Sequence, residues 1–277
     1  MKYYLETNSL RKLNNRLADI KEISFTSALS IFELISGIRQ QDFHIRKAVI
    51  KNIFDTELEV IWLFPEEVTV NAFPGMEFQE DRINSLKKLC QDLIESENIT
   101  SFLKKASKGK HNLEFFKNLD TQYSSKFTLA TLQGNKNLKA IIESQDEDFL
   151  IEFGKQYNKS LPTNYQVNNS VTLKAITSNL KDALELSSGE LIDEKEIYDH
   201  YNGSINIFIS AFSLFTAKKS AEFNTPAKND FIDLYHLIYL GNNQNYFIVT
   251  DDKMISENTP QVKKIAELIE LSKLLKM

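Results

Sequence analysis

The chain has very little cysteine and glycine, and both shortages exclude classes of protein. Cys90 is its only cysteine, so neither an intramolecular disulfide nor a zinc site built on cysteines can form. Only 8 of its 277 residues are glycine, and the sequence has no glycine-rich loop that could cradle a nucleotide phosphate. The motifs G-x-S-x-G, H-E-x-x-H and Cys-x-x-Cys are also missing. The common nucleotide-binding, serine-hydrolase, zinc-protease and redox classes are therefore poorly supported.

Long apolar runs are missing as well. No segment approaches the roughly 18 apolar residues that suggest a membrane span. The N-terminus enters a predicted strand after a single lysine, which is unlike a signal peptide. Hydrophobic residues make up 42% and charged residues 26% of the chain, as in globular proteins. We therefore expect a cytoplasmic protein without a membrane partner, built as one large domain or two smaller ones.

Positive charge is not in excess. The net charge is −5, whereas many nucleic-acid binders present a basic face. The total is a weak guide, because metal-binding acids add negative formal charge that bound cations cancel. Local basic groups could still hold phosphates, although each group taken alone is best explained as a solvated helix face. These groups are Arg11, Lys12 and Arg16; Lys104, Lys105, Lys108 and Lys110; and Lys218 with Lys219.

Four acidic side chains stand within or directly after apolar segments. Glu6 and Asp252 each follow a short apolar strand, while Glu33 and Asp233 lie in apolar runs that are predicted to be helical. A carboxylate among apolar neighbours is costly unless a cation or hydrogen-bond donors compensate it. Ligands of open α/β sheets bind in the crevice outside the carboxyl ends of the strands. We therefore expect the four acids to share one site.

Strand signals are few and helix signals are many. Strands are predicted over residues 2–5, 23–25, 68–70 and 246–250. Helices are predicted over residues 8–20, 27–40, 43–63, 81–95, 137–157, 171–186, 205–221, 227–240 and 260–275. Because strands that alternate with helices indicate a parallel sheet, the expected fold class is α/β.

The predicted strands fall near the two ends of the chain, so a mainly α-helical insertion is expected to interrupt the sheet. Pro74-Gly75 is a strong turn signal and marks the near boundary. Weaker serine, asparagine and glycine signals mark the far one. We expect a discontinuous core over residues 1–74 and 201–277, and a helical insertion over residues 75–200.

Three parts of the sequence resemble the PIN-domain nucleases: residues 4–8, residues 27–34, and residues 230–237 followed by 247–253. In that family a strand-end acid with a nearby Asn, a helical Glu, an Asp opening a late helix and the last Asp of a Thr-x-Asp gather around divalent metal. The resemblance implies a PIN-like three-layer fold with a short, mostly parallel sheet flanked by helices. It implies catalytic and metal-binding roles for Glu6, Glu33, Asp233 and Asp252, supporting roles for Asn8 and Thr250, and Asp230 and Asp251 as neighbours that could substitute.

Two features depart from the family pattern. The first acid of the family is typically Asp, and Glu6 is one methylene longer, so it must either retract or move the metal. The stretch between Glu33 and Asp233 is also far longer than in compact family members, and the excess falls in the predicted insertion.

The chemistry of such a cluster follows from its ligands. Carboxylate oxygens suit Mg²⁺ or Mn²⁺, and two such ions about 4 Å apart can acidify a water and stabilise the leaving oxygen of a phosphodiester. We therefore expect a metal-dependent nuclease. The preference for RNA over DNA is implied by the resemblance alone. A toxin or effector role in a toxin-antitoxin or phage-defence system, an inhibitory protein partner and a homodimer stay open. The alternative is a catalytically weakened, PIN-like interaction module that binds a protein or RNA through its insertion.

Each candidate also has a purely structural explanation. Glu6 could cap the following helix, Asp252 could be a turn residue, and Asp233 could favour a helix N-terminus through the helix dipole. Glu33 is hardest to explain in this way, because its mid-helix position and apolar flanks exclude capping and turn roles. His236, one turn after Asp233, could contact metal or phosphate, but we expect it to be a hydrogen-bonded histidine of the core.

Overall fold

The fold is described from a computed structural model of the chain. It describes residues 1–76, 82–123, 148, 151–152, 169–189, 191–221, 226–227 and 229–275. The helix predicted over residues 137–157 therefore lies almost entirely outside the described residues.

A parallel β-sheet forms the centre of the fold. Its strands, in chain order, are β1 (Lys2–Leu5), β2 (Ser24–Ser27), β3 (Glu59–Ile61), β4 (Tyr246–Val249) and β5 (Val262–Lys263). In the described residues they form one sheet in the order β3-β2-β1-β4-β5, with every neighbouring pair parallel. The class is therefore α/β with helices around a parallel sheet, as the alternation of strands and helices predicts.

The central strands are apolar because they are buried on both faces. Tyr4 of β1 lies opposite Phe25 of β2 on one side and Ile248 of β4 on the other. All three side chains are at most 1% exposed. Strand β1 from the start of the chain and strand β4 from its last part therefore become neighbours at the centre of the sheet.

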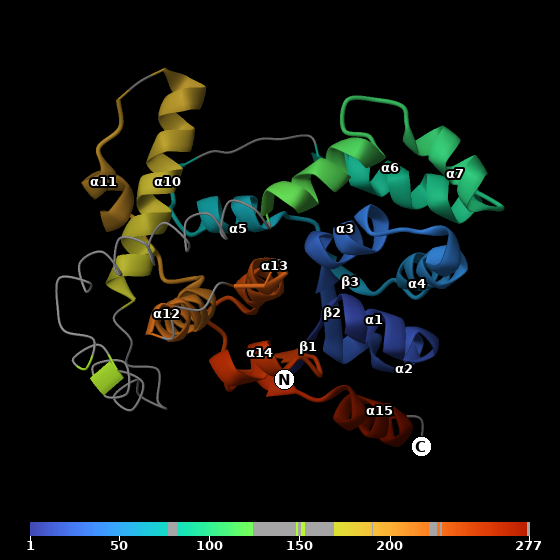
Figure 1. Ribbon diagram of the computed structural model, residues 1–277. Helices are drawn as coiled ribbons and strands as arrows, with labels where there is room; N and C mark the ends of the chain where they lie inside the picture. Colours follow the sequence, from blue (N-terminus) through green and yellow to red (C-terminus); the bar gives the residue numbers. More distant parts are fainter. Residues whose placement is uncertain are drawn as a thin grey trace.

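Helices cover both faces of the sheet (Figure 1). The first group is α1 (Thr7–Leu13), α2 (Leu17–Ile20), α3 (Ala28–Ser36), α4 (Phe43–Asp55) and α15 (Ile265–Leu274). The second is α5 (Pro65–Asn71), α12 (Asn206–Ala221), α13 (Asp230–Tyr235) and α14 (Lys253–Asn258). The remaining named α-helices are α6 (Arg82–Glu95), α7 (Ile99–Ala106), α10 (Ser170–Ser188) and α11 (Glu194–Asp199), and the 3₁₀ helices are Asn14–Arg16, Lys21–Ile23, Gln40–Asp42 and η4 (His236–Leu240).

Most of the predicted helices are confirmed, but the predicted helix over residues 43–63 is wrong in its second half. Helix α4 ends at Asp55, and β3 follows. Glu57 adopts the left-handed conformation with φ of 55°, and the amide of Leu58 donates to the carbonyl of Ile53 at 3.2 Å. This closes the helix as glycine usually does. Because no glycine stands there, the sequence carries no visible stop signal.

The predicted strand over residues 68–70 is also wrong, because these residues belong to helix α5. Pro65 occupies the first turn, where a missing N–H costs nothing. The Glu67 carboxylate accepts a hydrogen bond from the amide of Phe64 at 2.6 Å. Start signals and packing outweigh the β-branched pair Val68 and Thr69.

The described helices of the segment predicted as an insertion pack with the rest of the chain around one hydrophobic cluster. Helix α6 packs against α3 and α4. Residues 113–123 are also helical, and the ring of Phe116 lies 6.0 Å from Phe32 and 6.2 Å from Phe64, measured between ring centroids. The helices after residue 75 therefore help to bury the same core as the sheet.

No helix in the described part of the chain is both long enough and apolar enough to span a membrane.

Candidate functional site

The candidate site lies at the carboxyl ends of β1 and β4, the two neighbouring strands from which the strand order runs outward in opposite directions. The chain builds β2 and β3 on one side of β1, and β4 and β5 on the other. In such sheets the crevice outside the carboxyl ends of the two central strands is the usual ligand site. Glu6 directly follows β1, and Thr250, Asp251 and Asp252 directly follow β4. The fold therefore brings both acid-tipped strands to one edge of the sheet.

Glu6 is the N-cap of helix α1. One carboxylate oxygen accepts from the amide of Asn8 at 2.6 Å, and the other accepts from the amide and the hydroxyl of Ser9, each at 3.1 Å. The residue is 4% exposed. Burial raises the pKa of Glu6, against the opposing effects of the nearby His236 and of the Asn8 amide. The capping explanation of Glu6 is thus confirmed, which leaves both of its oxygens already bonded.

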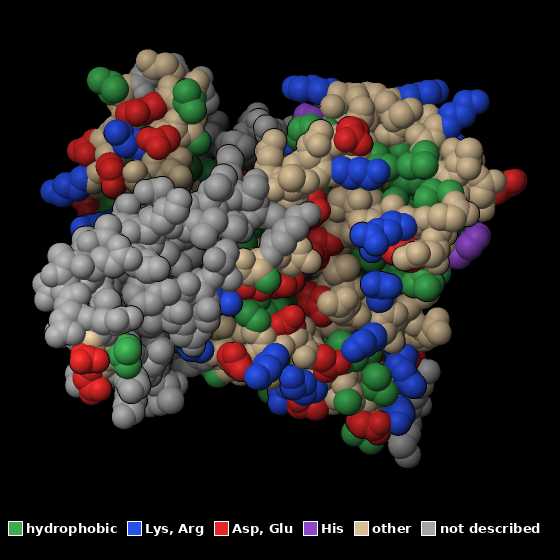
Figure 2. Space-filling view, viewed as in Figure 1, with side chains coloured by type: hydrophobic (Ala, Val, Ile, Leu, Met, Phe, Trp, Pro, Cys, Tyr) green, Lys and Arg blue, Asp and Glu red, His purple; other side chains and the backbone are tan. Residues whose placement is uncertain are grey.

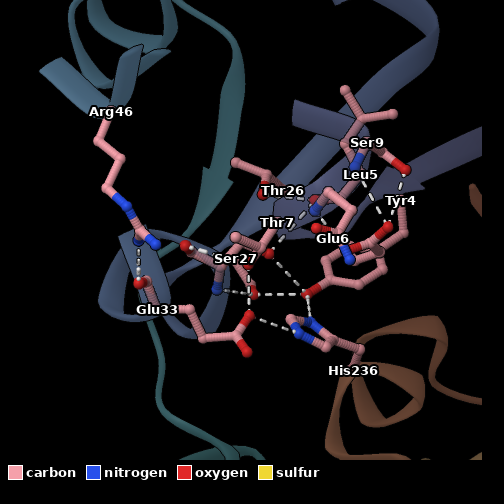
Figure 3. Close-up of polar contacts among 12 residues, drawn as sticks. Tyr4, Leu5, Glu6, Thr7, Ser9, Thr26, Ser27, Glu33, Arg46 and His236 are labelled. Carbon is pink, nitrogen blue, oxygen red and sulfur yellow. Dashed lines mark hydrogen bonds and ion pairs between the residues drawn. The ribbon is translucent and has the colours of Figure 1, made fainter. Parts of the chain in front are cut away.

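Glu33 projects from the middle of α3 into the same site (Figure 3). Its Oε2 accepts a short hydrogen bond from the Thr7 hydroxyl and lies 2.9 Å from Nε2 of His236. Helix α3 is anchored by Ser27, whose hydroxyl accepts from the amide of Ser30 at 3.4 Å. The mid-helix acid is therefore explained by two donors that come from distant parts of the chain.

His236 links Glu33 to the core of the sheet. Its Nδ1 lies 2.6 Å from the hydroxyl of Tyr4, which also lies 2.8 Å from Oγ of Ser27 (Figure 3). The ring is 2% exposed, so the prediction of a hydrogen-bonded core histidine is confirmed. Burial opposes the imidazolium form, but the neighbouring Glu33 outweighs it, and the pKa of His236 is raised.

Asp233 stands in the first turn of α13 and lines a cavity of about 270 Å³ together with Glu6 and Glu33. Among the described residues, no group donates a hydrogen bond to its carboxylate. Burial raises the pKa of Asp233 from 3.8 to about 7, with His236 opposing the shift and Glu33, Asp252 and Glu6 adding to it. Within the described part of the chain, Asp233 is thus an acid near three other acids, and no hydrogen-bond donor compensates its charge.

Asp252 is the N-cap of helix α14. Its carboxylate accepts from the amide of Ile255 at 3.2 Å, and its own amide donates to the hydroxyl of Thr250 at 3.0 Å. Thr250 is 1% exposed. The turn after β4 therefore fixes Asp252 through Thr250, and its charge is felt at Asp233.

The structure distinguishes the paired acids. Asp230 accepts from the amide of Ala227 at 2.9 Å and pairs with Lys219 at 3.6 Å. Asp251 pairs with Lys12 at 2.9 Å. Both alternatives are held by ion pairs, whereas Asp233 faces the cavity. We therefore keep Asp233 and Asp252 as the candidates.

Sequence reasoning missed two residues of the cavity, Arg46 and Asp120, and gave a third, Asn8, a supporting role. Asn8 and Arg46 line the cavity, and so does Asp120 from the helix over residues 113–123. Asn8 contacts Glu6 through its backbone amide, while its side chain was the expected contact. No sequence signal places Asp120 or Arg46 near Glu6, because only the packing of the helices brings them together.

As the side chains stand, no group of three or more His, Cys, Asp or Glu residues within the described ranges is placed to hold a metal ion. The physical reason is visible at two acids. Glu6 is bonded to helix α1, and Glu33 is bonded to Thr7 and His236. Glu6, Glu33 and Asp233 line one cavity, and the charge of Asp252 acts on Asp233, but the described side chains do not close a coordination shell.

Removing the Tyr4 hydroxyl is expected to lower the free energy of unfolding. In Tyr4→Phe, His236 Nδ1 and Ser27 lose a buried partner, which costs about 1–2 kcal/mol. Urea unfolding measures the loss. Tyr3→Phe is the matched control, because among the described residues the Tyr3 hydroxyl donates only to the sulfur of Met1 at 3.0 Å, a weak acceptor. Equal losses in both variants would contradict the structural role of the Tyr4–His236 contact.

Comparisons with known proteins add no identification: a scan against protein-family models, a search of curated proteins and a search of solved structures each find no match for this chain. The function is therefore argued from the side chains of the site.

Proposed function

We propose that this protein is a metal-dependent nuclease that hydrolyses phosphodiester bonds, with RNA as its expected substrate. The observation that carries the proposal is the state of Asp233. Its carboxylate lines a cavity at the carboxyl edge of the sheet, lacks a donor among the described residues and is surrounded by three further acids. A carboxylate in such surroundings gains most from a bound cation.

The donor set fits Mg²⁺ or Mn²⁺ in its chemistry, because every candidate ligand atom is a carboxylate oxygen. Asp233 offers the open carboxylate. Glu33 is the second candidate ligand, since its side chain is 21% exposed and lines the same cavity. Glu6 would have to exchange its capping bonds for the cation. A complete coordination shell around the cation thus requires the side chains of Glu33 and Glu6 to move while Asp233 stays in place.

The residues of the chain would divide the work of hydrolysis. A bound divalent cation supplies an acidified water and positive charge for the leaving oxygen. Asp233 would hold the cation. Thr7 and His236 would orient Glu33 through their hydrogen bonds. Asp252 would add negative charge near Asp233. His236 would keep its proton on the Glu33 side, because its Nδ1 faces Tyr4. No side-chain nucleophile is needed.

Cleavage assays test this proposal. Single-stranded RNA, structured RNA and single-stranded DNA are incubated with purified protein in Mn²⁺, Mg²⁺ or EDTA. We expect cleavage of RNA with metal only, reduced at least about 10-fold in Glu33→Gln. Glu22→Gln is the matched control, because the Glu22 side chain is 87% exposed and stands apart from the cavity. Cleavage that survives EDTA, or that Glu33→Gln leaves unchanged, would sink the proposal; cutting of DNA alone would overturn the RNA preference.

A narrower form of the proposal is that the nuclease acts as the toxin or effector of a toxin-antitoxin or phage-defence pair, held in check by an inhibitory protein. The motivating feature is the extra helical segment, which contributes Asp120 to the cavity wall and could report the presence of a partner. Overexpression in a bacterial host is expected to arrest growth, and Asp233→Asn to relieve the arrest. Normal growth with the intact protein would count against this role.

A second candidate function is a PIN-like interaction module with weakened metal binding. One observation favours it: both oxygens of Glu6 are bonded to the start of helix α1, so the longer acid serves the fold. Isothermal titration with Mn²⁺ separates the two functions. Heat of binding that is lost in Asp233→Asn supports the nuclease, and absence of binding supports the interaction module.

A further inference from the structure

The cavity that holds the acids also carries two cationic side chains. Arg11 and Arg46 line it together with Glu6, Glu33 and Asp233. Figure 2 shows Asp and Glu side chains gathered near the middle of this face, with Lys and Arg side chains around them. Acids alone would attract only cations. A cavity with both signs of charge fits a ligand that arrives as an anion and is processed with a cation.

Arg46 is held in place by its own element and by α3. Its Nε donates to Asp42 at 2.6 Å, and its Nη1 donates to the carbonyls of Glu33 and Leu34 at 2.8 and 3.0 Å. Among the described residues, nothing accepts a hydrogen bond from Nη2. The side chain is 13% exposed. A guanidinium that is fixed through Nε and Nη1, and whose Nη2 has no acceptor among the described residues, is preorganised to bind an oxyanion with little loss of entropy.

Gly37 leaves the space that this arrangement needs. A Cβ atom at position 37 would lie 3.1 Å from both Nη1 and Nη2 of Arg46 and 3.1 Å from the carbonyl oxygen of Glu33. These distances are tight, so any larger residue would push the guanidinium. The absence of a side chain at Gly37 therefore gives the guanidinium of Arg46 its space, and both residues line the cavity.

Arg11 is the more open of the two cations. It is exposed at the last turn of α1, where any basic residue favours the helix dipole. Against the effect of burial, its charge also helps to lower the pKa of Asp42. Two basic residues near it in the chain have direct partners: Lys12 pairs with Asp251, and Arg16 donates to Ser272 at 3.1 Å. Within the described ranges Arg11 has no ion pair or side-chain hydrogen bond, and of these three basic residues only Arg11 lines the cavity.

We propose that Arg11 and Arg46 form a phosphate-binding subsite that holds a backbone phosphate of a single-stranded nucleic acid beside the acids. This inference rests on the proposed nuclease function and names how the substrate is held. The cavity of about 270 Å³ lies at the small end of ligand pockets, so it takes a single sugar-phosphate unit. Because phosphate contacts carry no base information, the subsite positions the strand without reading its sequence.

Binding without metal tests the subsite separately from cleavage. Fluorescence anisotropy in EDTA measures the affinity for a labelled oligouridylate and a labelled oligoadenylate at several salt concentrations. Arg11→Gln is expected to weaken binding of both about 10-fold and to lower the salt dependence by about one phosphate contact. Arg16→Gln is the matched control, because it removes the same charge from a residue that does not line the cavity. It is expected to change the affinity less than about 2-fold.

Arg46→Lys and Gly37→Ala extend the test to the second cation. Both keep a positive charge at position 46 but disturb the fork of donors, so both are expected to weaken binding while circular dichroism shows a folded protein. Equal affinity of Arg11→Gln and Arg16→Gln, or no binding by the wild type, would overturn the subsite. Arg11-dependent binding without Mn²⁺-dependent cleavage would instead keep the subsite and reject the nuclease. Metal-dependent cleavage with a KM that Arg11→Gln leaves unchanged would keep the nuclease and reject the subsite.

Discussion

Asp233→Asn is expected to remove metal-dependent cleavage and at the same time to make the protein more stable at pH 8. The loss of cleavage should be about 100-fold or more, on the order of the cost of losing one charge-stabilising group in an active site. The gain in stability follows because Asn is neutral and similar in shape. Burial raises the pKa of Asp233, and the negative charges of Glu33, Asp252 and Glu6 raise it further. The variant no longer places a charge beside these three acids.

The sign of the pH dependence follows from the raised pKa. The carboxyl group of Asp233 titrates at about 7 in the folded chain, against an ordinary value of 3.8. Between these values the folded state keeps a proton that the unfolded state has lost, so stability falls as pH rises through this window. Asp233→Asn removes the loss, and we expect a gain of at most about 4 kcal/mol at pH 8 and almost none at pH 4.

Urea unfolding at pH 4, 6 and 8 measures this difference, and added Mn²⁺ supplies a second readout. Mn²⁺ is expected to stabilise the wild type by mass action and to leave Asp233→Asn unchanged. Asp230→Asn is the matched control on the same helix, because Asp230 is already paired with Lys219 and the amide of Ala227. It should lose a little stability and keep its cleavage. A wild type that is as stable at pH 8 as its Asp233→Asn variant would contradict the buried, uncompensated charge.

Phe116→Ala is expected to lower the free energy of unfolding by about 3–5 kcal/mol, the usual cost of removing a buried phenylalanine ring. Phe116 is fully buried. Its ring packs against Phe32 of α3 and Phe64 at the start of α5, so it joins the segment after residue 75 to the helices around the sheet. Because these residues share one hydrophobic cluster, we expect a single cooperative transition that moves to lower urea concentration.

Two probes check the cooperativity. Far-UV circular dichroism follows the helices, and fluorescence of Trp62, the only tryptophan, follows the region beside the sheet. Coincident transitions support a shared core. Phe54→Ala is the matched control, because Phe54 is 41% exposed and should cost about 1 kcal/mol or less. Two separate transitions, with only one of them moved by Phe116→Ala, would show that residues 75–200 fold as an independent unit.

The central strands and the anchored helix α3 were predictable from sequence because their signals are local. β1 was predicted with the bounds that the structure has, and β4 to within one residue, since short apolar runs between polar residues favour strands buried on both faces. Ser27 caps α3, the helix that carries Glu33, and a serine or threonine before an apolar run is a local start signal of a helix. Glu6 was also identified as a possible cap, because a strand-end acid stands next to free amides of the following helix.

The edge strands were not predictable, because their order depends on contacts between distant residues. β3 was read as the end of a helix, since its only break is Glu57 in a conformation that glycine usually adopts. β5 has two residues and is a strand through its pairing with β4. The strand predicted over residues 68–70 failed for the converse reason, because the start of α5 and its packing outweigh a short β-branched run.

The sequence by itself determined which acids would stand at the ends of apolar strands and inside an apolar helix, because those positions follow from local pattern and from the cost of burying charge. Only the tertiary structure decided which acid would be left without a donor. It turned Glu33 to Thr7 and His236, kept Glu6 on its helix and left Asp233 facing the cavity. It also brought Arg46 into hydrogen-bonding distance of two carbonyls of α3. The physical reason is that these hydrogen bonds join residues that are far apart in the chain and that only the fold brings together.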